Sequence, residues 1–266
     1  MREKGGGTDV NLKFLAPTYH ARVKAVLGLV RGGERLADIG CSAGEIGGLL
    51  APRFKAVVGV DLCKPDIACG QRLKAGNQCL LVGDVTRLPL QPRSFDVALC
   101  LETLEHVPGD ESVLAEIYGL LRPGGQLIVS VPHQRFPFTY DPVNALLGVF
   151  GLHLPIGMWG FGHLRLYSEE ELRNKLAVAG FVVEKRKRLT RFLAGLCENY
   201  LSSLFQFLVK PDASNQGRGG GTAFIRPKAI PDNFLVRWVG RLVALDEALF
   251  RNSKTSVGLL VEARKP

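Results

Sequence analysis

The 266-residue sequence predicts an α/β protein whose core is a doubly wound, mostly parallel sheet. Short apolar stretches, each long enough for one strand, alternate with amphipathic stretches that fit helices. The apolar stretches are nearly continuous, which is typical of strands that are covered by helices on both faces. The folded domain is expected over residues 17–266, after a polar, Gly-rich and flexible leader at 1–16.

The first part of the domain predicts a regular order of elements. A helix is expected at 17–31, because Pro17 suits a first helical turn. Five strands and three helices then alternate, with strands at 35–40, 56–61, 79–83, 95–100 and 126–132 and helices at 44–51, 65–75 and 111–121. Pro123, Gly124 and Gly125 are expected to stop the last of these helices and to turn the chain into the fifth strand.

The regular order ends after the fifth strand. Residues 133–167 form a long connection rich in Gly, Pro and aromatic residues, which we interpret as a lid or substrate wall. Ser168 suits the N-cap of a helix at 168–179. The rest predicts a sixth strand, a mostly helical insert and a seventh strand, at 181–189, 190–252 and 256–265.

Positive charge is concentrated in the last third of the chain. Residues 184–266 contain 15 Lys and Arg against 7 Asp and Glu, whereas residues 1–183 are nearly balanced at 19 against 18. The basic run at 185–188 precedes an apolar stretch at 192–209, in which Glu198, Asn199 and Gln206 argue against a membrane span. Peripheral membrane contact through 185–210 is one interpretation. The other is a helix packed on the domain, with 185–188 in a solvated edge strand.

The helix expected at 232–251 carries large apolar residues at helical spacing, with Arg237, Arg241 and Arg251 on its other faces. This pattern is interpreted as part of the core. Six scattered cysteines include no CxxC pair, so reduced thiols and no metal site are expected. The N-terminus has no apolar run behind its charges, so we expect no signal peptide and a cytoplasmic location.

A turn of small residues, Gly40 to Gly44, follows the first strand. A dinucleotide fingerprint would require glycines at 40, 42 and 45, but Ser42 and Glu45 occupy two of these positions. Glu45 would place a negative charge where a pyrophosphate binds. An NAD-dependent oxidoreductase is therefore an alternative with less support than a site for a nucleoside without phosphate.

Three acidic residues lie where ligands bind in a parallel sheet, at the carboxyl ends of strands. Asp61 ends the second strand, Asp84 follows the third, and Glu102 follows the fourth. Asp61 could accept from both hydroxyls of a ribose, and Asp84 with the backbone of Val85 could hold an adenine edge. The glycine turn would admit an amino-acid tail. This combination describes S-adenosylmethionine.

Five stretches together resemble the class I S-adenosylmethionine-dependent methyltransferases, especially the small-molecule and lipid-precursor branch related to ubiquinone and menaquinone methyltransferases. These stretches are LADIGCSAGEI, VVGVDL, GDVTRLPLQPRSFDVALCLETLEHV, LLRPGGQLIVSVP and LYSEEELRNKLAVAGF. The resemblance covers about residues 20–183 and implies a Rossmann-like, seven-stranded sheet whose last strand is antiparallel. Ser42 departs from the family's usual central glycine.

The resemblance also implies ten residues around S-adenosylmethionine. They would be Asp38, Gly40, Cys41 and Gly44 at the methionine portion, Asp61 and Leu62 at the ribose, Asp84 and Val85 at the adenine, and Leu101 and Glu102 beside the sulfonium.

Methyl transfer is an in-line displacement, so a general base is needed only where the acceptor loses a proton. His133, directly after the fifth strand, is the first candidate for that base, followed by His106 and His163. Tyr140 and Asp141 also fall near the expected pocket. His106 could instead shape the pocket and His163 anchor the lid, and Arg165 suits either an acidic substrate group or a structural ion pair.

The sequence thus predicts methyl transfer to a small or lipid-like acceptor, most simply at oxygen or carbon. Apolar and aromatic residues in 133–167 and 190–252 favour a bulky apolar acceptor. The end of the fourth strand lacks the Asn/Asp-Pro-Pro-aromatic motif of amino-group methylation, so no nucleic-acid partner is expected. RNA methylation through the basic last third and a non-catalytic membrane adaptor remain alternatives.

Overall fold

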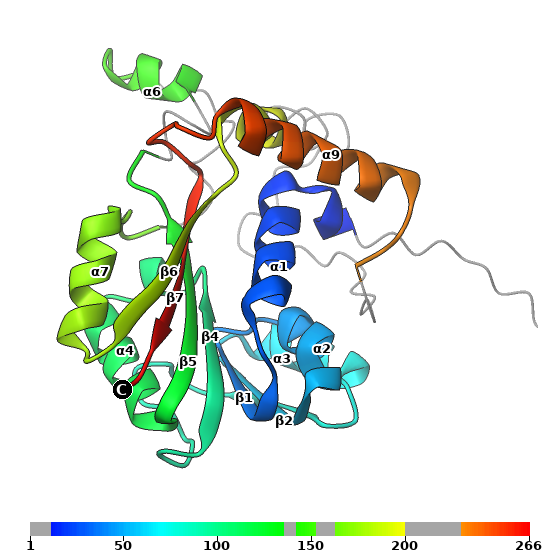
Figure 1. Ribbon diagram of the computed structural model, residues 1–266, viewed down its shortest axis with the longest axis vertical. Helices are drawn as coiled ribbons and strands as arrows, with labels where there is room; N and C mark the ends of the chain where they lie inside the picture. Colours follow the sequence, from blue (N-terminus) through cyan, green and yellow to red (C-terminus); the bar gives the residue numbers. More distant parts are fainter. Residues whose placement is uncertain (1–11, 136–141, 153–162, 200–229) are drawn as a thin grey trace, which may run out of the picture.

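The computed structural model describes residues 12–135, 142–152, 163–199 and 230–266 (Figure 1). Folded structure begins earlier in the chain than expected, with the 3-10 helix η1 (Leu12–Leu15). Phe14 of this helix is fully buried and packs against Val23 and Val236. The described end of the expected leader is therefore part of the core.

Seven strands form one sheet in the order β3-β2-β1-β4-β5-β7-β6. Strand β7 runs antiparallel to both neighbours, and the pairs among β1 to β5 are parallel. The predicted doubly wound sheet with an antiparallel last strand is thus confirmed. The strands are β1 (Gly33–Ile39), β2 (Phe54–Asp61), β3 (Gln78–Val82), β4 (Phe95–Leu101), β5 (Leu121–Pro132), β6 (Val182–Leu189) and β7 (Gly258–Arg264).

Helices cover both faces of the sheet (Figure 1). The main ones are α1 (Pro17–Leu29), α2 (Glu45–Leu50), α3 (Lys64–Leu73), α4 (Asp110–Leu120), α7 (Glu169–Val178) and α9 (Phe234–Leu249). Alternate residues of β4 supply the two cores, because successive side chains point to opposite faces of a strand. Ala98 and Cys100 pack on the side of α4 and α7, whereas Val97 and Leu99 pack on the side of α1. This is why the sequence of β4 is almost continuously apolar.

Pro123, Gly124 and Gly125 do not stop α4, which already ends at Leu120. They lie inside β5, where the pairing with β4 shifts register between Phe95 and Val97. Gly124 has φ +77, a left-handed conformation that glycine adopts without strain. The three residues therefore form an irregular start of the strand.

The structure describes only parts of the expected lid and insert. The lid contributes α6 (Pro142–Gly148) and a parallel bridge between His133 and Tyr167. The insert contributes a helix at 192–199 and α9, and residues 200–229 lie outside the described part. No helix among the described residues is both long and apolar enough to span a bilayer.

Candidate active site

The turn after β1 requires glycine at two positions. Gly40 and Gly44 both have φ +73, and a Cβ on Gly40 would lie 2.2 Å from Oγ1 of Thr103. Ser42 is also left-handed, at φ +49, and its hydroxyl donates to Asp66 Oδ2 at 2.7 Å. This hydrogen bond shows how a serine can stand where the family usually has its central glycine.

Asp61 holds this turn to the loop that follows β2. Its Oδ2 accepts from the backbone N–H of Ser42 at 2.7 Å, and its Oδ1 accepts from the backbone N–H of Cys63 at 2.8 Å. A carboxylate has about four lone-pair positions, so both oxygens can accept further hydrogen bonds from a ligand. The same side chain thus orders the turn and presents acceptors beside it.

A cavity of about 600 Å³ opens at the carboxyl ends of β1, β2 and β4. Its lining includes six of the ten residues expected around the cofactor, namely Gly40, Asp61, Leu62, Asp84, Val85 and Glu102. Asp84 is exposed, and its Oδ1 accepts from the backbone N–H and the hydroxyl of Thr86. These hydrogen bonds hold the pKa of Asp84 below its ordinary value, so the side chain is an ionised acceptor at neutral pH.

The other four expected residues do not line this cavity. Asp38 is buried beneath α2, where it accepts from the backbone N–H of Gly47 at 3.1 Å, and burial raises its pKa to about 7. Cys41 packs with Ile67 and Leu80. Gly44 is the N-cap of α2, and Leu101 belongs to the core on the α1 side. These four residues support the turn and do not line the cavity. Their positions depend on how α2 and α3 pack.

Glu102 stands between this cavity and a second one of about 90 Å³, since it lines both. It has φ +51, an uncommon conformation for a residue other than glycine. Its Oε1 accepts from Ser130 Oγ at 2.8 Å, and its Oε2 pairs with Arg22 Nη2 at 2.9 Å. Two contacts from α1 and β5 thus fix a carboxylate at the junction of the cavities.

The second cavity contains polar groups that lack partners within the structure. Thr190 is fully buried at φ +52, which is strained for a β-branched residue, and its hydroxyl makes no hydrogen bond among the described residues. The Nε of Arg22 is also buried without such a partner. Strain and unpaired polar groups concentrate at functional sites, so we regard this cavity as a candidate acceptor site. Sequence reasoning did not identify Arg22 or Thr190.

The structure separates the three candidate histidines. His106 lines the larger cavity and His163 the smaller one, with ring centroids 5.1 Å apart. His133 lines neither cavity, because the bridge to Tyr167 and the hydrogen bond from its N–H to Val257 bury it behind the end of β5. The preference for His133 as general base is therefore not supported by its position.

Three further candidates from the sequence have different outcomes. Arg165 pairs with Asp110 at 2.8 Å and donates to the carbonyl of Pro108, which corresponds to a structural ion pair. Tyr140 and Asp141 lie outside the described residues.

Glu105 is fully buried behind the two histidines, and neither carboxyl oxygen has a hydrogen-bond partner among the described residues. Burial, together with the charge of Glu102, raises its pKa to about 9. One potential ligand atom from each of Glu105, His106 and His163 lies within 4.8 Å of the others. These three side chains form a donor set that a divalent cation could use, although the cysteine pattern led us to expect no metal.

Glu105→Gln is expected to remove a pH dependence of stability. The folded protein retains the Glu105 proton up to about pH 9, whereas a glutamate of ordinary pKa 4.5 in the unfolded chain has lost it. This difference in pKa stabilises the folded protein relative to a chain in which both states ionise equally at high pH. The contribution is complete below pH 4.5 and is lost as the pH rises toward 9. The free energy of unfolding of the native chain should fall by about 1.4 kcal/mol per pH unit relative to the variant. Urea unfolding at pH 6, 7 and 8 measures the free energy of unfolding of both proteins. The same change with pH in the native chain and in the variant would contradict the prediction.

Part of the chain is similar in sequence to known methyltransferases. Residues 37–129 match the family model described as a methyltransferase domain. Ubiquinone biosynthesis O-methyltransferase of Pseudomonas putida strain F1 is 36% identical over 124 residues, which is 45% of this chain and 50% of the relative. The same enzyme of Idiomarina loihiensis is 35% identical over 104 residues, 37% of this chain and 42% of the relative. The chain thus spans about half the length of the curated relatives it matches.

Solved structures show the same fold at low sequence identity. A methyltransferase from Mesorhizobium loti has a TM-score of 0.56 and 19% identity, with 97% of this chain and 100% of that chain covered. The N-methyltransferase NodS from Bradyrhizobium japonicum, solved with S-adenosylhomocysteine, has a TM-score of 0.53 and 15% identity, with 94% and 88% covered. The cyclase SpnF has a TM-score of 0.59 and 18% identity, with 93% and 81% covered. At these identities the comparison concerns the fold alone, which does not fix a reaction.

The sheet order, the antiparallel last strand and the acids beside a glycine turn define a class I methyltransferase fold. The part of the chain that matches this class in sequence is residues 37–129, the stretch that fits the methyltransferase domain model.

Proposed function

We propose that this chain transfers a methyl group from S-adenosylmethionine to an oxygen or carbon of a small or lipid-like acceptor. One observation carries the proposal, which is that Asp61, Asp84, Glu102 and the glycine turn meet at a single cavity of about 600 Å³. Such a cavity offers acceptors for ribose hydroxyls and for an adenine amine, and it offers a carboxylate near a sulfonium. The names of the relatives, ubiquinone biosynthesis O-methyltransferases, support oxygen as the methylated atom.

The surroundings of Glu45 support a nucleoside without phosphate. Its Oε2 pairs with Lys13 at 3.0 Å and accepts from the hydroxyl of Tyr19 at 3.0 Å. The first turn of α2 is thus occupied by an acid of the chain itself, at the place where a dinucleotide would put its pyrophosphate. This observation weakens the oxidoreductase alternative.

The ten expected cofactor residues take two kinds of role in the proposal. Asp61 would bind the ribose and Asp84 with Val85 the adenine, with Leu62 covering the sugar. Gly40 would let the methionine portion approach, and Glu102 would attract the sulfonium. Asp38, Cys41, Gly44 and Leu101 would support the turn without contacting the ligand.

S-adenosylmethionine supplies an electrophilic methyl group, and the acceptor forms its new bond as the carbon–sulfur bond breaks. The residues of this chain would hold the reacting end of the acceptor in the smaller cavity, which shares Glu102 with the larger one. Burial and the nearby His106 lower the pKa of His163, so its imidazole is neutral at pH 7 and can accept a proton from an acceptor hydroxyl. Arg22 and Thr190 would bind the polar end of the acceptor.

Titration calorimetry with S-adenosylhomocysteine tests the cofactor part of the proposal. We expect binding with 1:1 stoichiometry at micromolar concentrations of the ligand. Absence of heat up to 1 mM ligand would contradict it. A labelled methyl donor incubated with separate lipid, aqueous and RNA extracts would then identify the acceptor class. Label recovered only in RNA would favour the alternative substrate.

A lipid-like acceptor would require contact with a membrane. The basic run at 185–188 is poorly suited to that contact, because its side chains are already paired with acidic residues of the chain. Lys185 pairs with Glu262 at 2.8 Å and Lys187 with Glu247 at 3.0 Å. Arg186 and Arg188 both pair with Glu169. These intramolecular ion pairs also weaken the case for RNA. Residues 200–210 of the expected segment lie outside the described part.

A further inference from the structure

Helix α9 has two apolar faces, of which one is buried. Val236 packs against Phe14 and Val23, and Val239 and Val243 pack against α1 and the helix at 192–199. Asp246, at the same face, is fully buried and accepts from the backbone N–H groups of Arg191 and Leu193. The helix is therefore held firmly on the domain by one side.

The second apolar face points away from the domain. It consists of five large side chains whose exposed fractions run from 50% for Leu245 to 76% for Phe234. The members of this outer face are Phe234, Leu235, Trp238, Leu245 and Leu249. A contiguous exposed group of large apolar residues marks a contact surface, because isolated apolar side chains are the norm elsewhere on proteins.

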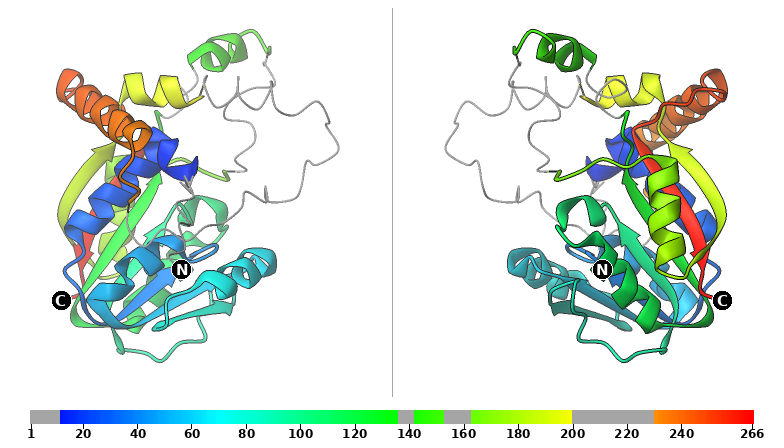
Figure 2. Two further views of the ribbon diagram at one scale, coloured as in Figure 1. Left: turned by 90° about the vertical axis from the view of Figure 1, so that its right-hand side faces the viewer. Right: turned by 90° about the vertical axis from the view of Figure 1, so that its left-hand side faces the viewer.

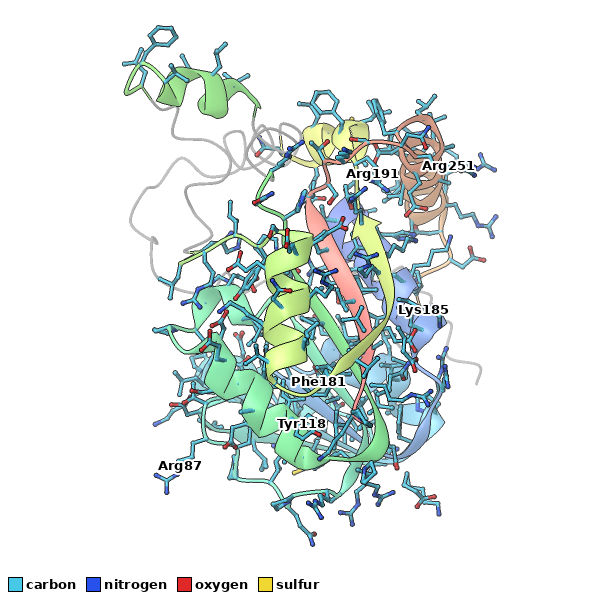
Figure 3. All side chains as sticks on the ribbon, turned by 60° about the vertical axis from the view of Figure 1, so that its left-hand side comes forward. Arg87, Tyr118, Phe181, Lys185, Arg191 and Arg251 are labelled. Atoms are coloured by element: carbon cyan, nitrogen blue, oxygen red, sulfur yellow. The ribbon has the colours of Figure 1, made fainter. Side chains whose placement is uncertain are left out.

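Cations border the outer face of α9. Arg241 lies on α9 and Arg251 follows just after its last residue, and among the described residues neither forms an ion pair. Arg251 also lines a groove of about 590 Å³ together with Arg191, and both side chains lie near the end of α9 in Figure 3. Apolar side chains edged by arginines match the interface of an anionic bilayer, where long basic side chains can extend to the headgroups.

The short helix α6 adds apolar surface at the same end of the molecule. Figures 1 and 2 show α6 and α9 beyond the carboxyl ends of the parallel strands, on the side where the cavities open. Four side chains in or just after α6 are at least 59% exposed, namely Leu146, Val149, Phe150 and Leu152. Two separate helices thus present apolar residues at the end of the molecule toward which the parallel strands run.

We infer that the outer face of α9 docks on the surface of an anionic phospholipid bilayer. The alternative occupant of such a face, a second copy of this chain, would bring the unpaired arginines of two copies together. An anionic bilayer instead complements them, and each basic residue near its surface adds attraction. The inference deepens the proposed function, because docking through α9 would bring the cavities close to a lipid-like acceptor.

Vesicle binding of the full chain tests this inference directly. The chain has two tryptophans, so Trp159→Phe leaves Trp238 as the only one. Vesicles of equal parts phosphatidylglycerol and phosphatidylcholine should shift the fluorescence of Trp238 to the blue and should carry the protein upward in flotation. Pure phosphatidylcholine vesicles should bind about tenfold less, and 0.5 M salt should reduce binding to the anionic vesicles. An unshifted Trp238 spectrum would overturn the inference.

Matched variants distinguish docking through the outer face from nonspecific binding of apolar surface to vesicles. Trp238→Ser combined with Leu249→Ser should lower flotation with anionic vesicles at least tenfold, because both side chains leave the interface. Val178→Ser removes an apolar side chain that is 86% exposed on α7 and should bind vesicles like the wild type. Equal binding by all three proteins would overturn the inference, and so would a dimer in solution that the double variant alone dissociates. Calorimetry with S-adenosylhomocysteine on each variant distinguishes failure of the site from failure of docking.

Discussion

Asp61→Ala is expected to weaken binding of S-adenosylhomocysteine about a hundredfold or more. The change removes the acceptors proposed for the ribose hydroxyls. Hydrogen bonds to a charged group contribute about 1.5–3 kcal/mol each, and about 1.4 kcal/mol corresponds to a factor of ten in affinity. The change also releases the backbone N–H groups of Ser42 and Cys63, so the loops that flank the cavity lose their common anchor.

The measurement is titration calorimetry on folded protein, with circular dichroism to verify the fold. Asp61→Asn keeps one acceptor oxygen and the size of the side chain, so its affinity should fall between those of the wild type and the Ala variant. Glu111→Ala, which removes an exposed carboxylate outside both cavities, should bind like the wild type. An unchanged affinity in Asp61→Ala would contradict the place given to the ribose.

Gly40→Ala is expected to destabilise the protein by about 2–4 kcal/mol and to abolish detectable binding of S-adenosylhomocysteine. The left-handed conformation at φ +73 costs an alanine about 1–2 kcal/mol. Its Cβ would also lie 2.2 Å and 2.5 Å from the side-chain atoms Oγ1 and Cγ2 of Thr103, so the turn or Thr103 must move. Either movement displaces a wall of the larger cavity, because Gly40 and Thr103 both line it.

Gly119→Ala is the matched control for this substitution. Gly119 lies inside α4, and an added Cβ there meets no atom within 4 Å. The control should stabilise the protein by about 0.5–1 kcal/mol, because alanine suits a helix better than glycine does. Urea unfolding measures both effects. Equal stability of the two variants would show that the turn tolerates a side chain at residue 40.

The strands, and six of the residues that line the larger cavity, could be predicted from the sequence because the information for them is local. A buried parallel strand is written as a continuous apolar run, and the residue that follows it lies at the edge where ligands bind. Asp61, Asp84 and Glu102 each follow such a run and line one cavity. The surroundings of His133 could not be predicted in this way. It is buried beside the bridge to Tyr167 and lines neither cavity, and its role as a base stays a prediction.

The smaller cavity could not be predicted, because its walls come from segments far apart in the chain. Glu198 accepts from Thr18 across 180 positions of sequence, and Arg22 reaches Glu102 from another element. The raised pKa of Glu105 could not be predicted for the same reason. It results from burial by neighbours that pack in three dimensions, and the sequence pattern around Glu105 does not show this burial.

By itself the sequence determined the class of fold, the glycine turn and the acids at the strand ends, because periodicity, turn chemistry and strand order depend on neighbouring residues. Only the tertiary structure decided which acidic residues support the turn and which line the cavity. It also decided where an acceptor could bind. It also decided which apolar face of α9 is buried. Two apolar faces look alike in a helical pattern, and only packing against Phe14 and Ala21 chose between them.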